Sequence, residues 1–143
     1  MKKICKCLIL AFLGLFCIIL LTGCKSKKER YISDKNSILT IDELYENFAY
    51  DSQYVTDKQE YKELLSDVVR EIKDIKMYTF AGKSVKKKYI KYIEECADCV
   101  LQYGNMSDDK FYDKLEEVEE KYRSKLEKAI QKFEKKYYKK VLK

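Results

Sequence analysis

The sequence predicts an all-α fold, an antiparallel bundle of three long helices with one short N-terminal helix alongside. The 143-residue chain contains no Pro and only four Gly, so it lacks the turn residues that an all-β chain needs. Apolar residues recur at spacings of three and four over most of its length. Because helices of this kind are not stable in isolation, we expect their apolar stripes to pack against one another.

The beginning of the chain has the layout of an export signal. Three lysines precede an apolar stretch of 14 residues, 8–21, which is too short for a membrane-spanning helix of roughly 20 residues. A run of polar residues follows. We therefore expect residues 1–23 to be a signal peptide, 24–39 a flexible linker with a reach of at most about 50 Å, and 40–143 the folded domain.

The end of this signal is Leu21-Thr22-Gly23-Cys24. It resembles the lipobox of bacterial lipoproteins, an aliphatic residue, a small residue, Gly or Ala, and Cys. The resemblance implies that diacylglycerol is attached to Cys24, that the chain is cut after Gly23, and that the protein lies at the extracytoplasmic face of the cell membrane. Two acyl chains give stable anchoring where one would be marginal. The alternative is an uncleaved anchor or an ordinary secretory signal, in which Cys24 is incidental.

The helices are expected to begin at residues with capping character. The spacing of Thr40 and Glu43 predicts the start of a short helix, and Thr56 with Gln59 predicts a second start. The last helix is expected to begin at Ser107 and to run to about Val141. The expected buried stripes are Ile41, Leu44, Tyr45 and Phe48; Tyr61, Leu65, Val68, Ile72 and Ile75; Val85, Tyr89, Ile93, Cys96, Val100 and Tyr103; and Phe111, Leu115, Val118, Tyr122, Leu126, Ala129, Phe133, Tyr137 and Val141.

A break between the second and third helices is predicted at residues 79–84. Gly82 is a possible helix terminator and Ser84 a possible new cap. The alternative is one unbroken helix from Thr56 to Gly104, because a single Gly inside a helix costs only about 1 kcal/mol.

Lysines follow this break in a pattern that is unfavourable for a helix start. Five positive side chains in the first turns of a helix oppose its dipole, so either the helix does not start there or another group compensates. With the break, these lysines would lie near those of the last helix and form a basic pole. Such a pole could contact anionic lipid or a cell-wall polyanion, although a solvated surface is the simpler interpretation. The candidate contact residues are Lys83, Lys86, Lys87, Lys88, Lys91, Lys135, Lys136, Lys139 and Lys140.

The residues that could carry chemistry are few. The chain has no His, the commonest general base and zinc ligand. Cys96 and Cys99 have C-x-x-C spacing, but they fall deep inside a predicted helix and have no third Cys or His beside them. We interpret them as buried thiols, with a redox-linked dimer as the alternative. No metal, cofactor or catalytic residue is expected.

These observations favour a small, surface-anchored lipoprotein that acts by binding and is not an enzyme. Its expected partners are the membrane, through the lipid anchor, anionic lipid or a cell-wall polymer, and a protein; nucleic acid is not expected. The first alternative is an accessory subunit that docks on a membrane protein complex with the surface of its last helix. A cell-wall enzyme is a further alternative, for which the chain offers no catalytic constellation.

Overall fold

The computed structural model describes residues 25–105 and 107–143, and within them the chain is all-α, as predicted. Helices α2 (Lys27–Asp51), α3 (Lys58–Asp74) and α4 (Phe80–Gln102) are followed by α5 (Asp108–Val118) and α6 (Ser124–Tyr137). Short 3-10 turns, η1 (Ser52–Tyr54) and η2 (Tyr103–Asn105), end α2 and α4. Two π-helical segments, η3 (Glu119–Arg123) and η4 (Tyr138–Leu142), follow α5 and α6.

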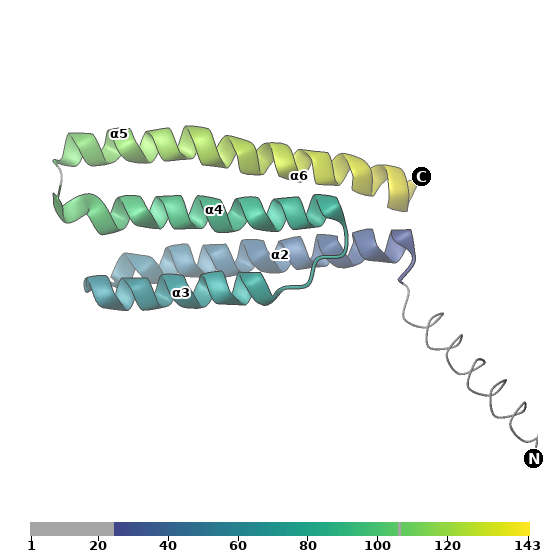
Figure 1. The fold of residues 1–143 in the computed structure, drawn as a ribbon, viewed down its shortest axis with the longest axis horizontal. Coiled ribbons are helices and arrows are strands. Elements are labelled where there is room, and N and C mark those ends of the chain that lie inside the picture. Colours follow the sequence, from purple (N-terminus) through teal and green to yellow (C-terminus); the bar gives the residue numbers. More distant parts are fainter. Residues whose placement is uncertain (1–24, 106) are drawn as a thin grey trace, which may run out of the picture.

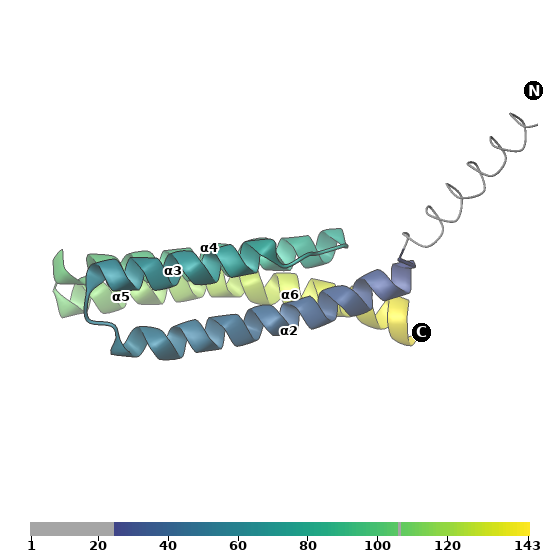
Figure 2. The ribbon, with the colours of Figure 1, turned by 90° about the horizontal axis from the view of Figure 1, so that it is seen from below.

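The helices lie side by side and alternate in direction, with α5 and α6 forming one long rod (Figure 1). Helix α4 is central and contacts α2, α3, α5 and α6. The start of α2, the connection between α3 and α4, and the C-terminus lie at the same end of the molecule, as both views show (Figures 1 and 2).

The first helix is long, so the prediction of a short N-terminal helix is wrong. Helix α2 begins at Lys27, and the expected linker, 24–39, is helical from that residue onward. Ser26 and Glu29 form a capping box that starts it: Glu29 N donates to Ser26 Oγ, and Ser26 N donates to Glu29 Oε2. The buried face of its first half includes Asp34 (0% exposed). A charged residue in this place interrupts the apolar stripe, and for that reason the stripe was not recognised.

A break between the second and third helices is present, but at residues 75–79 and not at the predicted 79–84, and the alternative of one helix from Thr56 to Gly104 is wrong. Residues 75–79 separate α3 from α4. The cap of α4 is Thr79, whose hydroxyl accepts a hydrogen bond from Gly82 N at 2.9 Å, so neither Gly82 nor Ser84 has the predicted role. Similarly, Asp57 and not Thr56 caps α3. In both corrections the cap lies within a few residues of the predicted one.

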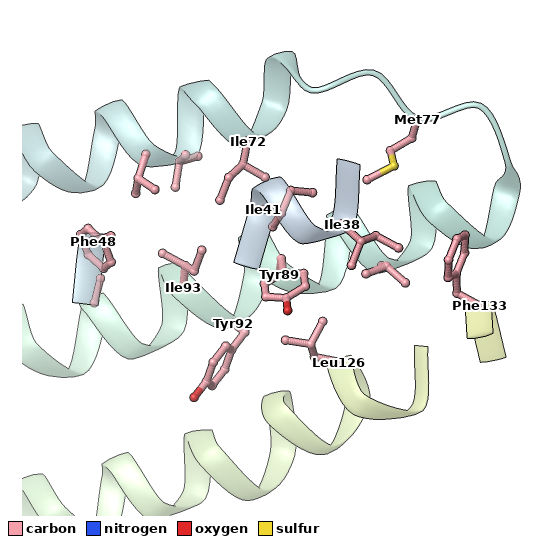
Figure 3. Close-up of a cluster of buried hydrophobic side chains, with 14 of the residues drawn as sticks. Ile38, Ile41, Phe48, Ile72, Met77, Tyr89, Tyr92, Ile93, Leu126 and Phe133 are labelled. Carbon is pink, nitrogen blue, oxygen red and sulfur yellow. The ribbon is translucent and has the colours of Figure 1, made fainter. Parts of the chain in front are cut away.

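One hydrophobic core runs through the described part of the chain (Figure 3). Ile41, Ile72, Val85, Ile93 and Phe133 are completely or almost completely buried in it. The buried face of α4 is wider than one stripe because this helix has neighbours on several sides, and it also includes Tyr92, Ala97 and Cys99. The same helix leaves Val100 and Tyr103 exposed near its end, where they had been expected in the core.

Phe133 provides a test of this core. Its ring is fully buried and lies 5.8 Å from that of Tyr31, between the start of α2 and the end of α6. We expect Phe133→Ala to lower the free energy of unfolding by about 3–5 kcal/mol, because it removes buried apolar area and leaves a cavity. Urea denaturation followed by circular dichroism measures this change. The control is Phe80→Ala, at a position that is 83% exposed; a loss above about 0.5 kcal/mol there would contradict the described packing.

Candidate functional site

The connection between α3 and α4 is held by a buried carboxylate. Asp34 Oδ1 accepts a hydrogen bond from Tyr78 N at 2.7 Å, and Asp34 Oδ2 accepts from Thr79 N at 2.8 Å and from Thr79 Oγ1 at 2.6 Å. Asp34 belongs to α2, so these bonds join the beginning of α2 to the beginning of α4. They satisfy two backbone N–H groups that a buried turn would otherwise leave without partners.

Gly82 is required for this close approach. A Cβ atom built on Gly82 would lie 2.3 Å from Asp34 Oδ2, which is well inside van der Waals contact. The glycine therefore lies in the first turn of α4 because α2 passes close to it there, and not because the chain turns at that residue.

The same carboxylate explains how α4 can begin with several lysines in its first turns, although their positive charge opposes the helix dipole. Helix α4 does start at Phe80, with Lys83, Lys86 and Lys87 in its first turns. Asp34 accepts all three of its hydrogen bonds and supplies negative charge at the N-terminal end of the helix, where the dipole favours an anion. Asp34 is therefore the group that compensates the positive charge of the lysines at the start of α4.

Two of the nine predicted contact lysines have partners within the molecule. Lys86 Nζ donates to the carbonyl oxygens of Lys73 and Ile75, at 2.8 and 2.7 Å, and so satisfies carbonyls at the end of α3. Lys91 Nζ lies 2.5 Å from Glu95 Oε1, one turn along α4. Lys86 therefore joins α3 to α4, whereas Lys91 forms a surface ion pair within α4. Among the described residues, no hydrogen bond or ion pair of the other seven lysines is observed.

The lysines of α3 and α4 line an open groove of about 350 Å³ on the outer side of α4. Six of them surround it, together with Ile90 and Glu94: Lys73, Lys83, Lys86, Lys87, Lys88 and Lys91. Six lysines and one Glu give the surroundings of this groove a net positive charge, which favours anions nearby.

The lysines of the last helix lie at the same end as the start of α4. Lys135, Lys136, Lys139 and Lys140 are all exposed. Lys132 and Lys136 line a small hollow with Phe80 and Ser84, so α6 and the first turn of α4 are adjacent there. The structure therefore brings the two predicted lysine groups to one end of the molecule. Cys24, the predicted lipidation site, lies outside the described residues.

We define the basic end as residues 25–36, 73–88 and 132–143. It contains 17 basic and 4 acidic side chains, whereas the rest of the chain from residue 25 contains 10 basic and 20 acidic ones. The contribution of residues 25–36 was not predicted, because these residues were expected to form a linker. The positive charge of these residues is evident from the sequence, but their place beside the starts and ends of the other helices is not.

A second hollow of about 270 Å³ lies between α2 and α6, lined by tyrosines and carboxylates. Tyr89 donates its phenolic hydrogen to Asp42, and Tyr92 donates to Glu119. Burial, and these carboxylates next to them, raise the pKa of both phenols above the ordinary value. Protonated phenols that are already bonded to carboxylates cannot act as bases near neutral pH.

The two cysteines are free thiols in α4, Cys99 buried and Cys96 half-buried. Burial, with the Glu119 carboxylate nearby, raises the pKa of Cys96 to about 11, and burial also raises the pKa of Cys99. A catalytic or redox-active thiol needs the opposite shift.

No protein family, curated protein or solved structure matches this chain. Within residues 25–105 and 107–143, no helix combines the length and the apolar content that would be needed to cross a membrane. The same residues contain no group of three or more Cys, Asp or Glu side chains placed to hold a metal ion.

The close approach of α2 and α4 predicts a specific effect of an added methyl group. We expect Gly82→Ala to destabilise the protein by about 1–3 kcal/mol, because either Asp34 or the first turn of α4 must move. The matched control is Gly104→Ala, where the nearest neighbouring atom would be Lys58 Nζ at 3.9 Å. That change should be neutral or slightly stabilising. Urea denaturation of both variants measures the difference, and equal stabilities would contradict the packing at Gly82.

The raised thiol pKa predicts slow alkylation in the native protein. With a pKa of about 11, only roughly one Cys96 thiol in a thousand is ionised at pH 8, whereas the unfolded chain has about a hundredfold more thiolate. We expect iodoacetamide to label Cys96 about a hundredfold more slowly in the native state than in urea, and the native rate to rise as the pH approaches 11. Mass spectrometry of the labelled peptides measures both rates, and fast native labelling at pH 8 would refute the shift.

Proposed function

We propose that this protein is a small lipoprotein, anchored at the extracytoplasmic face of the cell membrane through Cys24, that acts by binding and not by catalysis. The observation that carries the proposed anchor is the lipobox Leu21-Thr22-Gly23-Cys24, and the position of the first helix indicates what the anchor would hold. Helix α2 begins at Lys27, only three residues after the cysteine of the lipobox. A lipid on Cys24 would therefore hold a folded helical body close to the membrane, with no flexible linker between them.

The chemistry of the described hollows supports a binding role. In the hollow between α2 and α6, Tyr89 donates to Asp42, and Tyr92 donates to Glu119 beside it. The groove beside α4 contains lysines and one Glu, without a nucleophile paired to a base. These groups can hold an anion or support the fold, and neither arrangement provides an acid and a base for a reaction.

A second candidate function is that of an accessory subunit of a membrane protein complex. It is favoured by exposed tyrosines at the end opposite to the basic end. Tyr50 and Tyr54 form an exposed pair with ring centroids 5.2 Å apart, and Tyr103 and Tyr112 flank Phe111 where α4 meets α5. Tyrosine is enriched in protein interfaces. This candidate requires a protein partner at that end, which crosslinking in intact cells would capture.

Lipidation is tested directly by metabolic labelling. Cells that express the full chain are grown with a clickable fatty acid, and the wild type is compared with Cys24→Ser. We expect the wild type to carry the label and to sediment with the membrane, and Cys24→Ser to lose the label, because the thioether needs the sulfur of that residue. Cys17→Ser is the matched control and should remain labelled. An unlabelled wild type, or a label that survives in Cys24→Ser, would overturn the proposal.

A further inference from the structure

We infer that the basic end lies against an anionic phospholipid surface, with Phe80 among the headgroups. The inference deepens the proposed function and rests on it, because a lipid on Cys24 is what would bring this end to the membrane. It also commits to one orientation, in which the long axis of the molecule points away from the bilayer.

The basic end is a single surface built from segments that are far apart in the sequence. Lys25 Nζ lies 4.2 Å from the centre of the Tyr78 ring, which joins the start of α2 to the connection between α3 and α4. Lys35 Nζ lies 3.2 Å from Glu134 Oε1, which joins α2 to α6. The hollow lined by Phe80 and Lys136 joins α4 to α6. Figure 1 shows that the start of α2, the connection between α3 and α4, and the C-terminus lie at one end of the molecule.

Basic side chains outnumber acidic ones at this end by 17 to 4. Three of its four carboxylates have partners within the fold: Asp34 is buried at the α4 cap, Glu29 bonds to the backbone of Ser26, and Glu134 pairs with Lys35. The fourth is Asp74. In contrast, 14 of the 17 basic side chains are exposed. Repulsion among them favours contact with an anionic surface.

Exposed apolar side chains lie among these lysines. Phe80 is 83% exposed at the start of α4, and Tyr138 and Leu142 are 59% and 62% exposed near the C-terminus. Lysine mixed with Phe, Tyr and Leu is the composition of segments that bind at the bilayer interface, where apolar groups enter the headgroup region and lysines contact phosphates. A soluble or wall-bound polyanion would use the lysines and leave Phe80 without a role. This observation favours lipid.

The proposed anchor is at the same end. Lys25 belongs to the basic end, and its Cα is about 3.8 Å from that of the residue before it, Cys24. Because α2 begins at Lys27, the first residues of the basic end would lie within the roughly 8 Å over which charge acts at physiological ionic strength. A lipid chain combined with a polybasic surface is a common pair of membrane-binding signals.

The charge contribution is tested without the anchor. The mature chain from residue 24, carrying Cys24→Ser, includes every residue of the described core and is mixed with vesicles. We expect it to sediment with phosphatidylglycerol vesicles, not with phosphatidylcholine vesicles, and to be released by about 0.5 M salt. A quadruple variant should bind anionic vesicles at least about tenfold more weakly; it changes four lysines to Gln, Lys135, Lys136, Lys139 and Lys140. The matched control changes Lys58, Lys62, Lys110 and Lys121 to Gln, removes the same charge away from the basic end, and should bind almost as the parent does.

The orientation is tested by fluorescence, because the chain contains no Trp. In the same unlipidated chain, Phe80→Trp places one indole at the basic end, and Tyr54→Trp places one at the opposite end, where Tyr54 is 68% exposed. We expect the emission of Phe80→Trp to shift to the blue on anionic vesicles and to be quenched by brominated lipid. The emission of Tyr54→Trp should not change. Circular dichroism of each variant confirms that it is folded.

The outcomes separate this inference from the proposed function. No vesicle binding, equal loss in the two quadruple variants, or a blue shift in Tyr54→Trp would overturn the inference while leaving fatty-acid labelling of Cys24 unaffected. Salt-sensitive binding to purified teichoic acid with none to vesicles would also overturn it, by assigning the lysines to a wall polymer. Conversely, vesicle binding without fatty-acid labelling in cells would support the basic end as a lipid-binding surface and would overturn the proposed lipid anchor at Cys24.

Discussion

The hydrogen bonds of Asp34 are the interaction on which the arrangement of the helices depends. This carboxylate reaches from α2 to the backbone of Tyr78 and Thr79, and so holds the first helix against the start of the central one. It is fully buried, and Gly82 provides the space for it. Its negative charge also permits α4 to begin immediately before a group of lysines. The connection between α3 and α4 and the placement of those lysines both depend on this single side chain.

The lysines have two different roles, which their spacing in the sequence does not distinguish. Lys86 donates to carbonyls at the end of α3, and Lys35 pairs with Glu134 of α6, so both contribute to the fold. Lys83, Lys87 and the lysines of the last helix remain exposed at the basic end. The molecule therefore carries opposite net charges on its two parts, and a lipid at Cys24 would be attached at the positive one.

Most of the helical content could be predicted from local patterns, and the failures have identifiable causes. The start of the last helix after Ser107 was predicted correctly, whereas the break before Phe80 was predicted a few residues too late, because Thr79 and not Ser84 caps α4. The beginning of α2 was missed because buried Asp34 made its apolar face look polar. Val100 of α4 and Tyr103 of η2 have the spacing of core residues but are exposed, because spacing alone does not say which part of a helix has a neighbour.

The sequence by itself determined the all-helical class, the excess of Lys over other charged residues near the chain ends, and the lipobox pattern at residues 21–24, since each is a property of neighbouring residues. Only the tertiary structure decided that residues 25–36, 73–88 and 132–143 form one basic end, and that Asp34 compensates the start of α4. These contacts join residues 44 or more positions apart, and their partners depend on the directions in which the helices pack. No local pattern contains that information.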